Sequence, residues 1–96
     1  MARETVKKEI VIKNKQGLHA RPAATFVQIA NKFDSDISVI KDGEEVNGKS
    51  IMGILMLAAE QGTIVYLKAT GPDAEEAVVE LEKILTDEGQ DLADLK

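Results

Sequence analysis

The chain has no cysteine and a single histidine among its 96 residues. Without cysteine there is no disulfide and no thiolate-bound metal, and one imidazole has no second imidazole with which to hold zinc or a di-metal cluster. We therefore expect neither a metal nor any other cofactor. The sole imidazole, His19, suits a covalent phosphate better than metal binding or acid–base work.

Aromatic side chains and positive charge are also scarce. The sequence holds one Tyr, two Phe and no Trp, and its formal net charge is −5. Binding of DNA or RNA usually needs a basic surface and aromatic rings on which bases stack. The composition thus argues against a nucleic-acid partner.

Long apolar runs are missing as well. The most apolar stretch, residues 51–59, is far shorter than the roughly 18 residues that a membrane-spanning helix needs. The start, Met1 to Glu4, lacks the apolar core of a signal peptide. We expect no membrane insertion, a cytoplasmic location, and one domain over residues 1–96 with a short polar tail from about residue 89.

The periodicity predicts four strands. Runs rich in β-branched residues cover 6–12, 36–40, 44–47 and 63–69. The second and third runs are joined by Lys41-Asp42-Gly43, and Asp-Gly between β-prone runs is a strong hairpin signal. All four strands fit one antiparallel sheet.

Two amphipathic helices and one short helix complete the pattern. A helical stripe runs over 20–33, a second follows Asp73 and ends before Gly89, and one or two turns follow Ser50. Asp73 and Ser50 are residue types that cap helix N-termini. The order βαββαβα predicts an α+β fold, an open-faced β-sandwich in which helices cover one face of a four-stranded antiparallel sheet.

The chemistry points to His19. Taken alone, a solitary histidine is more often a plain surface or cap residue. Here it stands where a helix begins, and the free amides and dipole of a helix N-terminus favour an anion and disfavour an imidazolium. Arg21 adds a planar cation that suits phosphate, although it also fits an ordinary exposed residue.

A second candidate region begins at Ser50. As a plain N-cap it stabilises its helix by roughly 1 kcal/mol, and as a phosphorylation site it would gain roughly −1.5 to −2 charge where the helix dipole tolerates it. The residues alone favour the plain cap.

The short helix after Ser50 is crowded with apolar side chains. At least two of Ile51, Met52, Leu55 and Met56 are expected in the core, and the remainder would form an exposed patch. On the outer side of the first long helix, the residues Ala24, Thr25 and Gln28 are small or uncharged. The predicted docking surface comprises Ala24, Thr25, Gln28, Ile51, Met52, Leu55 and Met56.

Two segments carry a resemblance. Gly17-Leu18-His19-Ala20-Arg21-Pro22-Ala23 and Lys49-Ser50-Ile51-Met52-Gly53 resemble the two signature segments of HPr, the histidine-containing phosphocarrier family of the bacterial phosphoenolpyruvate:sugar phosphotransferase system. The similarity covers nearly the whole chain, and the family's fold is the same βαββαβα sandwich.

The resemblance implies a phosphoryl relay by a carrier, not an enzyme. His19 would accept the group from phospho-enzyme I and pass it to sugar-specific IIA components, Arg21 would pair with it, and the backbone amides of Ala20 and Arg21 would hold its oxygens. Ser50 matches the regulatory site of HPr kinase/phosphorylase. A transcriptional regulator such as the catabolite control protein is a further partner of the Gram-positive type, and we expect a monomer.

Two alternatives stay open. A true histidine-nucleophile enzyme would need a second titratable group near His19, and none is visible in the sequence. A purely regulatory or nitrogen-branch relative is the other. His19 argues against relatives that have lost it, and Ile51-Met52-Gly53 favours the sugar branch.

Overall fold

The computed structural model describes residues 4–87. The predicted tail from about residue 89 lies outside the described residues. The described chain folds in the order βαββαβα, and its elements are β1 (Glu4–Val11), α1 (Ala20–Ala30), β2 (Asp36–Lys41), β3 (Glu44–Asn47), α2 (Ile51–Met56), β4 (Ile64–Gly71) and α3 (Ala74–Leu85).

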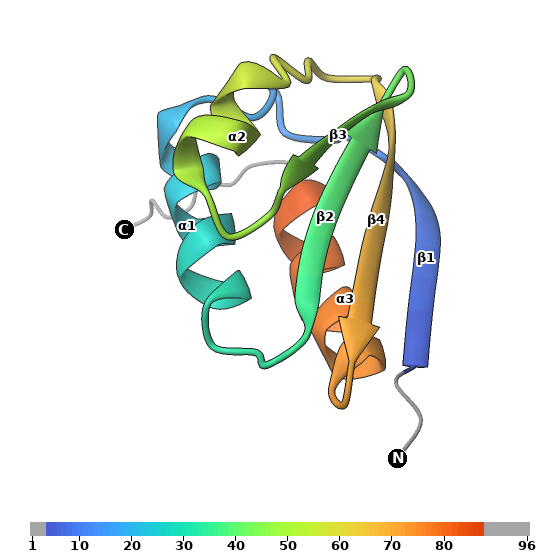
Figure 1. Ribbon diagram of the computed structural model, residues 1–96. Coiled ribbons are helices and arrows are strands. Elements are labelled where there is room, and N and C mark those ends of the chain that lie inside the picture. The colour runs from blue at the N-terminus through green and yellow to red at the C-terminus, as the bar shows by residue number, and fades with distance from the viewer. Residues whose placement is uncertain (1–3, 88–96) are drawn as a thin grey trace.

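The four strands form one antiparallel sheet in the order β1-β4-β2-β3. The helices lie on one side of it and leave the other side open (Figure 1). Helix α3 packs on β1 and β4, α1 packs on α3, and α2 packs on α1 and β3. The predicted open-faced sandwich is therefore confirmed.

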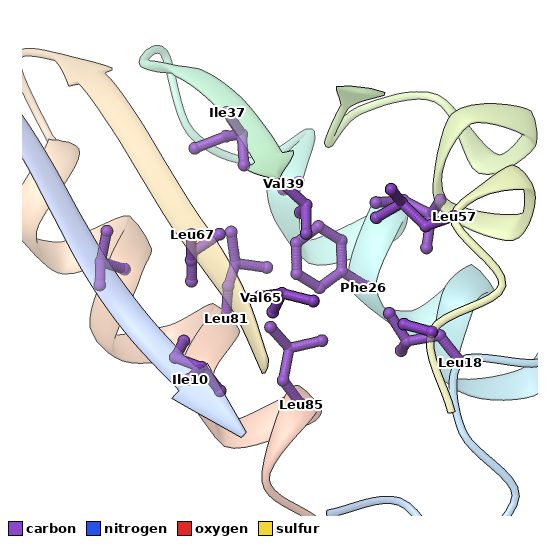
Figure 2. Packing of buried hydrophobic residues seen from close by; sticks show 14 of the residues in the cluster. Ile10, Leu18, Phe26, Ile37, Val39, Leu57, Val65, Leu67, Leu81 and Leu85 are labelled. Atoms are coloured by element: carbon purple, nitrogen blue, oxygen red, sulfur yellow. The ribbon is translucent and has the colours of Figure 1, made fainter. Parts of the chain in front are cut away.

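The core fills the space between the helices and the sheet. Alternate residues of β2 and β4 point inward, and Phe26 of α1 is completely buried. Figure 2 shows the Phe26 ring directed towards the strands from which Val39 and Val65 project. Removing a side chain of this size from a core costs about 3–5 kcal/mol, so this cluster is the main support of the sandwich.

The strands agree with the sequence prediction to within two residues at each end. The hairpin is confirmed too: Asp42 and Gly43 both have positive φ, +52° and +82°, as a type I′ turn requires. The first helix is shorter than predicted, because it ends at Ala30 and not at Phe33. The amides of Lys32 and Phe33 bond three residues back, to Ile29 and Ala30, and this tighter turn closes the helix.

The prediction that the Asp73 side chain caps the last helix is wrong. Asp73 occupies the N-cap position of α3 but makes no side-chain bond to that helix. Its carboxylate instead accepts the amides of Asp34 and Ser35, at 2.9 and 3.0 Å, and the Ser35 hydroxyl. The acidic residues of the first turn, Glu75 and Glu76, complement the helix dipole instead.

Within residues 4–87, no helix is long and apolar enough to cross a membrane. No group of three or more metal-ligating side chains gathers in that range either.

Candidate functional site

His19 is exposed and occupies the N-cap position of α1. Its imidazole makes no cap hydrogen bond to the helix, although a side chain at this position commonly does. Its own carbonyl accepts the first helical bond, from the amide of Ala23 at 3.0 Å. The imidazole therefore lies exposed at the N-terminal end of the helix without capping it.

The loop before His19 is held firmly. The amide of Leu18 donates to the carbonyl of Ala59 at 2.8 Å, and the Leu18 side chain is buried. Gly17 has φ +72°, and a Cβ there would lie 2.5 Å from the Ala59 oxygen. Only glycine fits both the conformation and the close approach, so Gly17 allows the loop before α1 to pack against Ala59, in the segment that follows α2.

The first turn of α1 favours an anion. The amides of Ala20 and Arg21 come before the first intrahelical donor, Pro22 has no N–H, and the first turn contains no acidic residue. Arg21 is exposed beside them. The first turn that follows His19 thus carries the positive end of the helix dipole, two amides without an intrahelical partner and one exposed cationic residue.

Ser50 is the N-cap of α2, as predicted. Its Oγ accepts the amide of Gly53 at 3.1 Å, and its own amide donates to the carbonyl of Asn47 at 3.1 Å. Gly53 lets α2 lie close to β3, because a Cβ there would be 3.2 Å from the Asn47 oxygen. The hydroxyl is part-buried and its orientation is fixed by the cap.

The predicted docking residues are gathered on α1 and α2, which pack side by side (Figure 1). Met52 and Met56 are 63% and 68% exposed, and Ile51 is 39% exposed. On α1, Thr25 and Gln28 are exposed and Ala24 is half-buried.

One expectation about this patch is wrong. At least two of the four named apolar residues of α2 were expected in the core, but only Leu55 packs partly against it. Ile54 and Leu57 fill the core instead, because the helix turns that face towards the sheet. More apolar surface is therefore left exposed than the sequence indicates.

One contact at the C-terminal end of α2 has no signal in the sequence. The Lys41 ammonium, from the end of β2, donates to the carbonyl of Leu57 at 2.9 Å. A cation at the last carbonyls of a helix is favourable. Lys41 is 16 residues away from Leu57 in the chain, so local pattern could not reveal the pairing.

The open-faced sandwich and the exposed histidine at the N-terminal end of α1 are the features expected of a small phosphoryl-carrying protein. A family model described as "PTS HPr component phosphorylation site" matches residues 6–87. The chain belongs to the HPr family of phosphotransferase-system phosphocarriers.

Individual relatives agree with this. The chain is similar to the HPr-like protein Crh of Bacillus subtilis, with 48% identity over 86% of this chain and 98% of that one. It is also similar to the phosphocarrier protein HPr of Neisseria meningitidis serogroup A, with 49% identity over 76% and 82% of the two chains.

Solved structures give the same result. HPr-C-His from Thermoanaerobacter tengcongensis superimposes with a TM-score of 0.83 at 53% identity, covering 91% of this chain and 99% of that one. A crystal structure of Bacillus subtilis Crh, described as a swapped, intertwined dimer, superimposes with a TM-score of 0.71 at 46% identity, covering 90% and 99%.

Proposed function

We propose that the chain accepts a phosphoryl group on His19 from phospho-enzyme I and passes it to sugar-specific IIA components. The observation that carries the proposal is the uncapped, exposed imidazole beside the free amides of Ala20 and Arg21. A ring nitrogen of His19 forms a bond to phosphorus while the donor's bond to the same phosphorus breaks. In the second transfer the phosphorus forms a bond to the IIA component while its bond to the His19 nitrogen breaks.

The surrounding groups stabilise the phosphorylated form. The phosphoryl oxygens gain negative charge next to the helix N-terminus, where each favourable interaction contributes about 0.3–1 kcal/mol. Arg21 offers a charge-assisted hydrogen bond on the solvent side. The chain turns over no substrate of its own in this scheme; it acts in the cytoplasm as a substrate of other enzymes.

Docking would use the exposed apolar surface beside the histidine. Met52 and Met56 are flexible and polarizable, which suits a surface that must meet enzyme I and several IIA components in turn. A phosphate on Ser50, added by HPr kinase/phosphorylase, would place negative charge at that surface and slow approach of the anionic donor. The same phosphate could recruit a transcriptional regulator such as the catabolite control protein.

The test is a reconstituted relay. Purified chain, enzyme I and labelled phosphoenolpyruvate are incubated, a IIA component is added, and the modified residue is mapped by mass spectrometry. We expect an acid-labile phosphate on His19 that chases onto the IIA component and that is absent from His19→Ala. Label on another residue, or none on the wild-type chain, contradicts the proposal. Turnover of small phosphate esters by the chain alone would instead support an enzyme.

A purely regulatory role is the second candidate, favoured by the similarity to Crh. In that case Ser50 would be modified by the kinase while the chain failed to accept phosphate from enzyme I. Running both assays on one preparation separates the two candidates.

The carrier is proposed to act as a monomer, with β1 paired to β4 of its own chain. Crh shows that a relative can exchange segments between two copies. Light scattering of the chain over a range of concentrations decides between the two: a constant mass of one chain supports the monomer, and a stable dimer contradicts it.

A further inference from the structure

Three hydrogen bonds hold Lys49, the residue immediately before Ser50, and two of them reach residues far away in the chain. The amide of Lys49 donates to the side-chain oxygen of Asn47 at 2.9 Å, and its carbonyl accepts the side-chain amide of Asn31 at 3.3 Å. The Lys49 ammonium donates to the carbonyl of Phe33 at 2.7 Å. Both backbone groups and the side chain of one residue are thus engaged.

Two of these contacts join the C-terminal end of α1 to the start of α2. Asn31 is the C-cap of α1, and its side-chain amide also donates to Val27 within that helix at 2.9 Å. The last turn of α1 has no basic residue of its own, and the Lys49 ammonium bonds the Phe33 carbonyl in the turn that follows the helix. We call Asn31, Lys49 and the Phe33 carbonyl the α1–α2 clamp.

The serine that follows the clamp is also ordered, by hydrogen bonds of its own. The amide of Ser50 bonds the Asn47 carbonyl, its backbone is extended at φ −112° and ψ 118°, and its hydroxyl oxygen accepts the Gly53 amide. The hydroxyl proton stays available, because the oxygen acts only as acceptor in that bond. Ser50 is therefore presented in one ordered geometry and not on a loose loop.

We propose that Asn31 and Lys49 are positioning residues for phosphorylation of Ser50, an inference that rests on the proposed kinase modification. In that step the Ser50 oxygen bonds the γ-phosphorus of ATP, the bond to the ADP oxygen breaks, and the hydroxyl proton passes to a base of the kinase. A kinase that binds a segment already ordered loses no free energy in ordering it. The clamp therefore acts on binding, through KM, and leaves the transfer step unchanged.

The experiment compares HPr kinase kinetics on four variants of the full chain: Asn31→Ala, Lys49→Met, the double variant and Lys8→Met. Lys8→Met is the matched control, because it removes one ammonium from an exposed ion pair that joins β1 to Glu82 of α3 and involves neither α2 nor the clamp. We expect KM to rise about three- to tenfold in each clamp variant with kcat unchanged, as loss of one ordering contact implies.

Further readouts identify the clamp as one unit. Since both bonds hold Lys49 against the C-terminal end of α1, the KM of the double variant should not exceed that of the more impaired single variant. Lys49→Arg should recover most of the wild-type KM, and amide exchange at Lys49 and Ser50 should quicken in Asn31→Ala and Lys49→Met. Phosphorylation of His19 by enzyme I should stay at the wild-type rate in all of them.

The outcomes separate the inference from the proposed function beneath it. A wild-type chain that the kinase leaves unmodified overturns the regulatory proposal and the clamp together. A wild-type chain that is modified, with the clamp variants matching Lys8→Met, overturns the clamp alone. Additive effects in the double variant, or a fall in kcat at constant KM, also overturn it, because they place the side chains in direct contact with the kinase.

Discussion

Ser35 and Asp73 form a reciprocal hydrogen-bonded pair. The Ser35 hydroxyl donates to the Asp73 carboxylate and accepts the Asp73 amide at 3.2 Å. Ser35 is completely buried, and Gly71 lies so close that a Cβ there would come within 2.7 Å of the Ser35 Cα. The pair ties the turn after α1 to the turn before α3, which are 38 residues apart in the chain.

The Ser35–Asp73 pair predicts a pH dependence of stability. The Ser35 hydroxyl, followed by the Asp34 amide, holds the pKa of Asp73 below its ordinary value. A carboxyl whose folded pKa is below its unfolded pKa contributes stability that is full above the unfolded value, near pH 4, and is lost as pH falls through the folded value. We expect Asp73→Asn to lower the Tm at neutral pH and to flatten the decline of Tm below about pH 4.

Thermal unfolding followed by circular dichroism from neutral to acid pH measures this. Asp42→Asn in the exposed hairpin turn is the matched control and should track the wild type at every pH. An Asp73→Asn curve that runs parallel to the wild-type curve would contradict the prediction.

The same pair shows where local sequence reasoning stops. Strands, hairpin and the Ser50 cap follow from periodicity and residue type, which act within a few neighbours, and they were predictable. The Asp73 side chain accepts hydrogen bonds from Asp34 and Ser35 and none from its own helix. This arrangement depends on two turns that meet only in the folded chain. Lys41 and the α1–α2 clamp also join distant segments, so they appear only in the folded chain.

In the candidate site, too, some features could be predicted from the sequence and others could not. His19 and Ser50 could be picked out because each stands at a helix N-terminus, a position that sequence marks well. The orientation of α2 could not, since which of its apolar residues face inward depends on β3 and on the approach that Gly53 allows. For this reason Ile54 and Leu57 were missed as the buried residues.

Arg21 should affect transfer and not stability. It is exposed at the first turn of α1, where a cation opposes the helix dipole. We expect Arg21→Met to lower kcat/KM for phosphorylation by enzyme I by about tenfold to a hundredfold through loss of a charge-assisted bond, with the free energy of unfolding within about 0.5 kcal/mol of wild type. The kcat/KM of Arg21→Lys should lie between those of Arg21→Met and wild type, because an ammonium keeps the charge without the planar fork of the guanidinium.

Rapid-quench kinetics and chemical denaturation measure the two quantities on the same samples. Equal kcat/KM in Arg21→Met and wild type would remove Arg21 from the phosphoryl site.

Ser50 variants separate its role as a cap from its role as a charge site. Ser50→Ala removes the acceptor for the Gly53 amide and should cost about 1 kcal/mol, or roughly 4–8 °C in Tm. Ser50→Asp keeps a capping oxygen and should hold the Tm near wild type while slowing phosphorylation of His19 by enzyme I. Slow transfer in Ser50→Ala as well would show that the cap, and not the charge, controls the rate.

Met52 tests the docking surface against a matched site elsewhere. Met52 and Val79 are both apolar and exposed, at 63% and 51%, but Val79 lies on α3, which packs mainly on β1, β4 and α1. A carboxylate placed in an apolar interface loses its hydration without a partner, whereas on a free surface it stays hydrated. We expect Met52→Asp to raise the Kd for enzyme I at least about tenfold, which is about 1.4 kcal/mol, and Val79→Asp to leave it unchanged. Titration calorimetry gives the Kd, and a native circular dichroism spectrum of both variants confirms that folding is intact. If the two substitutions weaken binding equally, the effect comes from net charge, and the surface on α1 and α2 is not where enzyme I docks.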